Sequence, residues 1–260
     1  MTEMTVTGAA PSRAEPEGPL QSLRKLTMSG PALPRALPQL VPAVGRVGWR
    51  AELPVLRGSR STLRDLRRSD ARTLLAMMTV DEVARFISPP PSSVEGFERF
   101  IVWAREQRLA GHYACFGVVP AGCEHAVGLF QLRRLEPDVS TCEWGFALGW
   151  QYWGTGIFLE GARRVLDFSF DDIGIHRLEA RACVHNGRGN GALRKVGATQ
   201  EGLLRRSFLR NGTHHDQLLW SILQDDWARA KAVWGPKRGE RPVRSAAYRL
   251  ATARATGSRV

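Results

Sequence analysis

Two closely spaced glycines, Gly154 and Gly156, mark the stretch of this sequence most suited to chemistry. A run of alternating polar and apolar residues at 141–148 precedes them and is typical of a strand. Phe158 and Ala162 then follow at helical spacing. The glycines therefore lie in a turn that leads into a helix N-terminus, where unpaired N–H groups and about half a positive charge attract anions. Because glycine has no Cβ, a phosphate group can approach this backbone closely.

Three interpretations of the stretch from Gln151 to Gly156 are open. It could be an ordinary glycine turn between a strand and a helix. In a dinucleotide-binding fold a third glycine would stand at Leu159, and an acidic residue would follow about 20 positions on. Glu179 is near that distance, but it lies inside an alternating run. The stretch also resembles the GCN5-related N-acetyltransferases (GNAT), whose acetyl-CoA loop reads Gln/Arg-x-x-Gly-x-Gly/Ala, and Gln151, Gly154 and Gly156 match every defined position.

Two segments further along the chain resemble the same family. The segment 186–198 is similar to its Asn-x-x-Ser-Asn-x-x-x-x-Lys-x-Gly-Phe motif, and the segment 201–205 is similar to its Glu-Gly-x-x-Arg strand. In order and spacing they resemble the subgroup that includes the ribosomal-protein N-terminal acetyltransferases of the RimJ/RimL type. The resemblance covers residues 63–227.

The resemblance implies a site for acetyl-CoA as co-substrate. The loop N–H groups would hold the pyrophosphate, and pantetheine would lie between the strand before the loop and the strand at 176–182, which part in the family. A backbone N–H near Phe146 would steady the thioester oxygen, and Asn186 would contact the pantetheine arm or order its loop. No metal is implied. The implied cofactor-binding residues are Phe146, Leu148, Gln151, Tyr152, Trp153, Gly154, Thr155, Gly156, Asn186 and Asn190.

Glu143 is the candidate general base, because it is the only acid in the strand before the loop and the family often has a glutamate there. The alternative is a strand glutamate that faces solvent or pairs with an arginine. Two proton donors common in the family are absent, since Gly189 stands at the serine position and Leu193 at the tyrosine position. A thiolate can leave unaided or through water, so the absence is compatible with an enzyme, a slow enzyme or a non-catalytic acyl-CoA-binding module.

The net charge of +12 is spread unevenly. Residues 1–50 carry six Lys and Arg against three Glu, and residues 231–260 carry eight against one, so the middle of the chain is nearly neutral. The basic tail could be a solvated appendage or a tether to an anionic surface such as ribosomal RNA.

Several classes of protein are not expected. No apolar run reaches the roughly 18 residues of a membrane span, and the first residues lack the pattern of a secretory signal. The four cysteines form no Cys-x-x-Cys pair, which favours free thiols in a reducing compartment over a zinc site. We therefore expect a cytoplasmic protein without membrane contact.

The periodicities predict an α/β fold, and the resemblance implies that it is a single GNAT-like domain. We expect a mixed central sheet of six or seven strands flanked by about four helices, with Ser92 capping one helix and Glu95 completing its capping box. Seven of the fifteen prolines lie in residues 1–50, which are expected to be a disordered extension. The domain is expected at 51–230, and the basic tail at 231–260.

The predicted function is transfer of an acetyl group from acetyl-CoA to a primary amine by direct attack. The resemblance favours a protein N-terminal α-amine as acceptor. A small amine, such as an antibiotic or a polyamine, is the enzymatic alternative.

Overall fold

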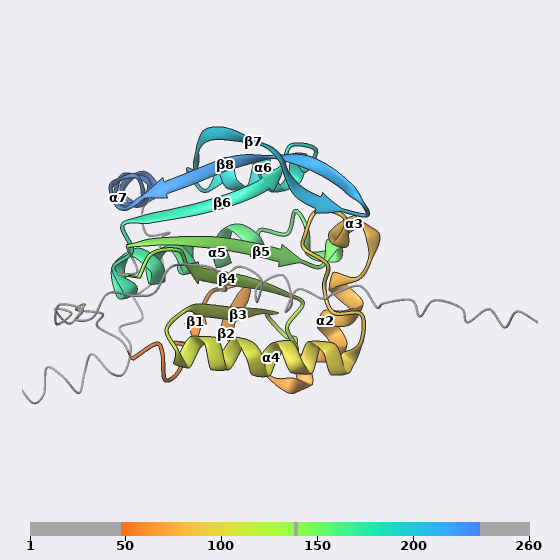
Figure 1. The fold of residues 1–260 in the computed structure, drawn as a ribbon. Coiled ribbons are helices and arrows are strands. Elements are labelled where there is room, and N and C mark those ends of the chain that lie inside the picture. Colours follow the sequence, from red (N-terminus) through yellow and green to blue (C-terminus); the bar gives the residue numbers. More distant parts are fainter. Residues whose placement is uncertain (1–47, 138–139, 235–260) are drawn as a thin grey trace, which may run out of the picture.

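The computed structural model describes residues 48–137 and 140–234 (Figure 1). Within these ranges, eight strands form one sheet in the order β1-β2-β3-β4-β5-β6-β8-β7. Neighbouring strands are antiparallel except β5 and β6, which run parallel. The strands are β1 (Leu56–Arg57), β2 (Ser61–Asp65), β3 (Tyr113–Pro120), β4 (Gly128–Arg134), β5 (Thr141–Leu148), β6 (Arg177–Cys183), β7 (Thr199–Arg210) and β8 (Thr213–Leu223).

Helices cover both faces of the sheet, and Figure 1 shows α4 in front of it with α5 and α6 behind. On the α5 face a core forms around the buried side chains of Val165, Leu193 and Trp227. On the α4 face a second core includes Leu74 and Phe97. The helices are α2 (Ala71–Met78), α3 (Asp81–Ala84), α4 (Val94–Leu109), α5 (Ile157–Asp167), α6 (Gly187–Lys195) and α7 (Gln224–Trp234).

The parallel strands β5 and β6 separate part-way along their length. They pair at Thr141 with Arg177, Cys142 with Leu178 and Glu143 with Glu179, and their pairing ends there. The rest of β5 stays paired with β4, and the rest of β6 stays paired with β8. Figure 1 shows the tips of the two arrows diverging, which opens a gap in the sheet beside the start of α5.

The predicted α/β class with a mixed sheet is confirmed, and the element count is slightly higher than expected. The described residues form eight strands and six α-helices. β1 and α3 have two and four residues, too short to show a periodic pattern. α7 was not predicted, and it includes Lys231, where the basic tail was expected to begin. The ammonium of Lys231 lies 2.7 Å from a carboxylate oxygen of Asp171, so this lysine belongs to the folded part.

The predicted cap of α4 was wrong by one residue. Ser93, not Ser92, is the N-cap, and its hydroxyl oxygen accepts a hydrogen bond from the N–H of Gly96 at 3.0 Å. Both serines had the right chemistry, and only the backbone geometry distinguishes them. The Pro-rich segment up to residue 47 and the tail from residue 235 lie outside the described residues.

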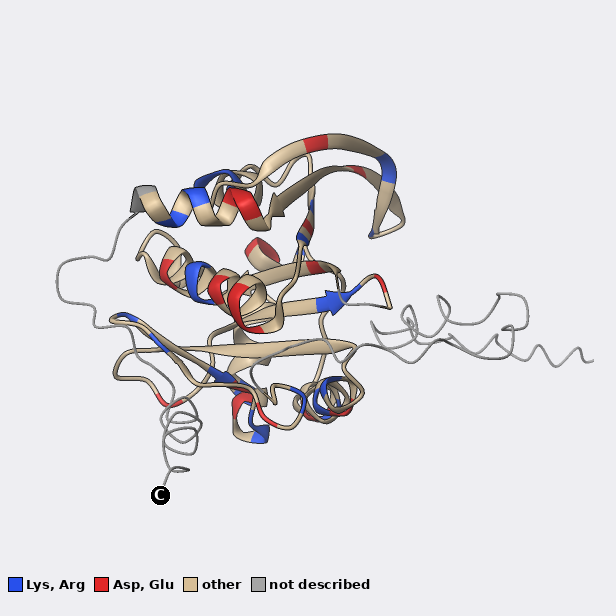
Figure 2. Ribbon diagram, turned by 90° about the vertical axis from the view of Figure 1, so that its left-hand side faces the viewer, with Lys and Arg blue, Asp and Glu red and all other residues tan. Residues whose placement is uncertain are grey.

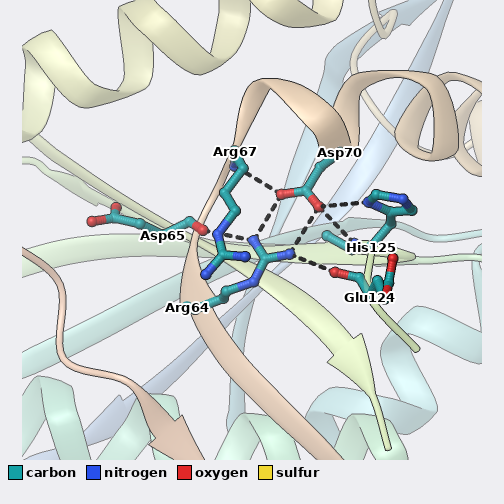
Figure 3. A network of polar contacts seen from close by, with 7 residues as sticks. Arg64, Asp65, Arg67, Asp70, Glu124 and His125 are labelled. Carbon is teal, nitrogen blue, oxygen red and sulfur yellow. Dashed lines mark hydrogen bonds and ion pairs between the residues drawn. The ribbon is translucent and has the colours of Figure 1, made fainter. Parts of the chain in front are cut away.

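A buried ion pair ties the start of α2 to the sheet (Figure 3). The guanidinium of Arg64 donates to both carboxylate oxygens of Asp70, at 2.8 and 2.9 Å. The carboxylate also accepts from the N–H of Arg67 at 2.7 Å and of Ala126 at 3.0 Å. Burial alone would raise the pKa of Asp70, but these hydrogen bonds and the charge of Arg64 outweigh it and lower the pKa. The network joins β2, α2 and the loop before β4 through one carboxylate.

We predict that Asp70→Asn destabilises the protein by about 3 kcal/mol at pH 7, because it leaves the Arg64 charge buried without its partner. The lowered pKa means that the stabilisation is present above the unfolded pKa of about 3.9 and is lost as the pH falls below it. Urea unfolding should therefore show that the free energies of unfolding of wild type and variant differ by a constant amount from pH 8 to about 5. Below that pH the difference between the two free energies should become smaller. Equal stability at pH 7 would contradict the structural role of the pair.

Candidate functional site

The gap between β5 and β6 exposes backbone hydrogen-bonding groups of β5. The N–H of Gly149 donates to the carbonyl of Val127 on the β4 side at 2.9 Å, next to the pair of Leu148 with Gly128. Successive residues of a strand direct these groups to opposite edges. The N–H groups of Leu148 and Phe146 therefore point away from β4, into the gap, where β5 has no further pairing with β6.

The loop from Gly149 to Gly156 carries the chain from the end of β5 to the start of α5. Gly154 and Gly156 have φ angles of 77° and 87°, and Gly156 is the N-cap of the helix. These left-handed conformations favour glycine. A Cβ on Gly154 would meet nothing within 4 Å, so the backbone there is open to a ligand. The loop thus aims the unpaired N–H groups of the first turn of α5 at the mouth of the gap.

Glu160 in the first turn of α5 fixes this loop to the β1–β2 turn. Its carboxylate accepts hydrogen bonds from the N–H groups of Ser59, Arg60 and Ser61 at 2.7, 2.9 and 3.0 Å. Burial would raise the pKa of Glu160, but a hydrogen bond from the Ser59 hydroxyl and those from the three N–H groups together lower it. Arg60 in turn donates to the carbonyl of Thr155 at 3.2 Å, which brings a guanidinium beside the glycine loop.

A cavity of about 780 Å³ joins the gap, the loop and parts of three helices. Its walls are the end of β5, the glycine loop with the start of α5, the α3 region, and α6 with the residues before it. This volume is within the range of ligand-binding pockets. Six of the predicted cofactor-binding residues line it, namely Phe146, Leu148, Trp153, Gly154, Gly156 and Asn186.

The other predicted cofactor-binding residues lie outside the cavity lining. Gln151 is exposed in a short 3-10 turn, and the half-buried Tyr152 follows it. The hydroxyl of Thr155 donates to the carbonyl of Tyr152 at 2.7 Å, which shapes the loop. The buried amide of Asn190 donates to the carbonyl of Cys183 and accepts from the indole N–H of Trp220, both at 2.9 Å. Asn190 therefore holds α6 against the end of β6 and against Trp220 of β8.

Asn186 has a structural task as well as a place in the cavity wall. Its side-chain oxygen caps α6 by accepting from the N–H of Gly189 at 2.8 Å. A Cβ on Gly189 would lie 2.4 Å from the Asn186 amide nitrogen, so a serine there would require this cap to shift. Leu193 is fully buried. Gly189 and Leu193, which stand where the family has its proton donors, therefore both have structural roles in α6.

Glu143 does not line the cavity. Its carboxylate forms an ion pair with Arg133 on β4 and lies 4.0 Å from the guanidinium nitrogen of Arg181 on β6. Strand alternation places it on the face of Gly145, opposite to the face of Phe146. The arginine pairing considered for this residue is present, and its role as a base stays a prediction.

The sequence of this chain matches the acetyltransferase (GNAT) domain family over residues 60–199. The chain belongs to the GNAT acetyltransferase family. It is an acyltransferase, in a family that uses acetyl-CoA as acetyl donor. No helix in the described ranges is long and apolar enough to cross a membrane.

The GNAT chain is similar to proteins named for ribosomal acetylation. The putative ribosomal N-acetyltransferase YdaF of Bacillus subtilis is 25% identical over 175 residues, which is 64% of this chain and 92% of that protein. The ribosomal protein uS5-alanine N-acetyltransferase of Escherichia coli is 27% identical over 133 residues, covering 51% of this chain and 69% of that one. The solved structure of Mycobacterium smegmatis RimJ in complex with CoA-disulfide has a TM-score of 0.60 and 22% identity, covering 67% of this chain and 89% of that chain. The predicted resemblance to the RimJ/RimL subgroup is confirmed.

Three parts of the site were not predicted. Arg60 and Glu160 are about a hundred residues apart in sequence, and only the acidic residue in the first turn of α5 could have hinted at their connection. The α3 region contributes Val83, Phe86 and Ile87 to the cavity, but its helix is too short to be recognised from periodicity. Arg188 lines the cavity from an undefined position of the family motif.

We predict that Glu160→Ala loosens the glycine loop and lowers the thermal midpoint by roughly 2–6 °C. The hydrogen bonds of this carboxylate contribute about 1–2 kcal/mol to the free energy of unfolding, once screening by solvent is taken into account. Glu106→Ala is a matched control, because Glu106 is an exposed helical glutamate whose side chain forms no hydrogen bond or ion pair with the described residues. Differential scanning calorimetry should separate the two variants, and equal midpoints would show that the Glu160 contacts do not hold the loop.

Proposed function

We propose that this chain transfers the acetyl group of acetyl-CoA to a protein N-terminal α-amine, by direct attack in a ternary complex. The observation that supports it most is the gap between β5 and β6, which leads directly to the glycine loop and the N-terminus of α5. Backbone donors inside the gap and at the loop fit the amide and phosphate groups of one long, anionic ligand.

Acetyl-CoA would supply the activated acetyl group as a thioester. The N–H groups of residues 151–156 would hold the pyrophosphate, and the walls at Phe146, Leu148 and Asn186 would hold the pantetheine arm. The N–H of Phe146 points into the gap and would stabilise charge on the thioester oxygen during attack. Holding both reactants in one cavity is itself a large rate effect, because it removes most of the entropy cost of bringing them together.

The charges of the cavity favour a protein α-amine over a polyamine as acceptor. Glu82 is the one carboxylate among the lining residues of the described cavity, and the same lining includes the three cations Arg85, Arg188 and Lys195. A polycation would be repelled by such a wall. Figure 2 shows acidic and basic residues interspersed over the described elements. The names of the ribosomal relatives support the same choice.

The leaving thiolate would take its proton from water. Gly189 carries no side chain and Leu193 is an aliphatic residue in the core, so neither can serve as the donor. The tether of the basic tail to ribosomal RNA stays a prediction, because residues 235–260 lie outside the described part of the chain. The cytoplasmic location is likewise our expectation.

We predict that acetyl-CoA at about 100 times its Kd stabilises the protein by roughly 2.7 kcal/mol, a rise of several degrees in Tm. NADH should have no effect. Gly156→Glu should abolish the shift, because it places a bulky negative side chain where the phosphates bind. Gly174→Glu is the control, because Gly174 has a positive φ of 84°, close to the 87° of Gly156, but lies just before the start of β6 and outside the cavity lining. A wild type without a shift would refute the cofactor assignment.

If Glu143 is the general base, Glu143→Gln should lower kcat by about 10²–10⁴ and leave the affinity for acetyl-CoA nearly unchanged. The decrease in kcat should be smaller at high pH, where the amine is already deprotonated. Arg133→Ala separates the two roles, because it removes the ion-pair partner and keeps the carboxylate. If both variants keep wild-type turnover at neutral pH, Glu143 is a structural partner of Arg133 and the amine loses its proton by another route.

A further inference from the structure

An arginine and a tryptophan meet across the cavity. The guanidinium carbon of Arg188 lies 4.4 Å from the ring centroid of Trp153, and both residues line the cavity. Trp153 belongs to the glycine loop after β5, whereas Arg188 lies in the first turn of α6, after β6. The stacked pair therefore bridges the two sides of the gap.

Trp153 is the fixed member of the pair. Its indole N–H donates to the carbonyl of Leu148 at 2.8 Å, and the half-buried ring packs against both apolar cores. A ring anchored in this way offers one face for stacking. A guanidinium stacked on an aromatic face keeps its N–H donors in its own plane, where they remain available to an anion.

Arg188 has no anionic partner within the described part of the protein. The side chain is exposed, and no described carboxylate lies within 4.0 Å of its nitrogen atoms. Lys195, at the end of the same helix, lines the same cavity and likewise has no ion-pair partner there. The α6 wall of the cavity thus presents two uncompensated cations.

We infer that Arg188 binds a phosphate group of the CoA moiety, and that Trp153 is the residue that positions its guanidinium for this contact. The inference rests on the proposed acetyl-CoA site and adds a side-chain contact to the backbone donors of the loop. Arginine suits this task because its planar donors match two phosphate oxygens at once. The stacking reduces the side-chain entropy that would otherwise be lost on binding.

The chain provides a closely matched control for this contact. Arg194 on the same helix stacks on Trp220 at 5.5 Å, but neither residue lines the cavity. Arg188→Ala and Arg194→Ala therefore remove the same charge and the same type of contact from one helix. Only the first is expected to change the affinity for the cofactor.

The experiment is isothermal titration calorimetry of wild type and both variants with acetyl-CoA. Arg188→Ala should raise Kd at least tenfold, as expected for the loss of a charge-assisted hydrogen bond, and Arg194→Ala should leave it unchanged. The difference in Kd between Arg188→Ala and wild type should become smaller as the salt concentration rises from 50 to 500 mM. Added ions screen the attraction between charges but leave packing contacts unchanged. Equal affinities of the two variants, or a loss independent of salt, would overturn the inference.

A second comparison, with the 3′-dephosphorylated form of acetyl-CoA, shows which phosphate is bound. If Arg188 contacts the 3′-phosphate, Arg188→Ala should bind acetyl-CoA and the dephosphorylated form with equal affinity. If Arg188 contacts the pyrophosphate, the variant should bind each of the two forms more weakly than wild type does. Failure of the wild type to bind acetyl-CoA at all would refute the proposed function itself, and so is distinguishable from a failure at Arg188.

The positioning role of Trp153 is tested by a double-mutant cycle. In a Trp153→Leu background the effect of Arg188→Ala should fall to a few-fold or less, because the guanidinium is no longer held in place. Trp153→Phe keeps an aromatic face and should restore most of that effect. An undiminished effect of Arg188→Ala in the Trp153→Leu background would show that the ring does not position the arginine.

Discussion

Strands β5 and β6 share three residue pairs and then separate, and the whole site depends on that separation. Separated strands leave backbone N–H and C=O groups without partners, which is costly in a protein interior unless water or a ligand satisfies them. The remaining neighbours keep the strands apart. β4 holds β5 along its full length, and β8 holds β6 as far as Cys183. The amide of Asn190 adds a third restraint by tying α6 to Cys183 and Trp220.

The electrostatics of the site follow from this geometry. Because the gap ends at the glycine loop, its mouth meets the N-terminus of α5 and the guanidinium of Arg60. Glu160 fixes the backbone of Arg60 by accepting from its N–H. The first turn of α6 borders the same opening and brings Arg188. At the α3 wall the apolar side chains of Val83, Phe86 and Ile87 lie beside Glu82 and Arg85. Cations therefore outnumber carboxylates in the cavity lining. An anionic donor and a singly charged amine fit such a lining, whereas a polycation does not.

Local patterns of the sequence were enough to predict the central elements. The alternating run at 141–148 forms β5 with the same limits, because one face packs against α5 while the other does not. The positive φ angles of Gly154 and Gly156 explain why the glycines stand where they do. The family motif added Asn186, whose capping role fits its place at the start of α6.

What the sequence did not predict depends on contacts between distant segments. No local pattern links Glu160 to Ser59, or Arg188 to Trp153, since these pairs form only after the sheet has brought their elements together. Glu143 illustrates the same limit. Its place in the strand suggested a base, but whether Arg133 occupies its carboxylate depends on the register of β4 against β5. Short elements such as α3 were missed because four residues cannot show a helical period.

The most direct test of this account is mass spectrometry of a panel of acceptors incubated with the protein and acetyl-CoA. The panel should contain peptides with free and blocked α-amines, including N-termini of ribosomal proteins, together with polyamines and aminoglycosides. The account predicts one added acetyl group on the α-amine of free peptides and none on blocked peptides or polyamines. Acetylation confined to the small amines, or binding of acetyl-CoA without acetylation of any acceptor, would contradict it.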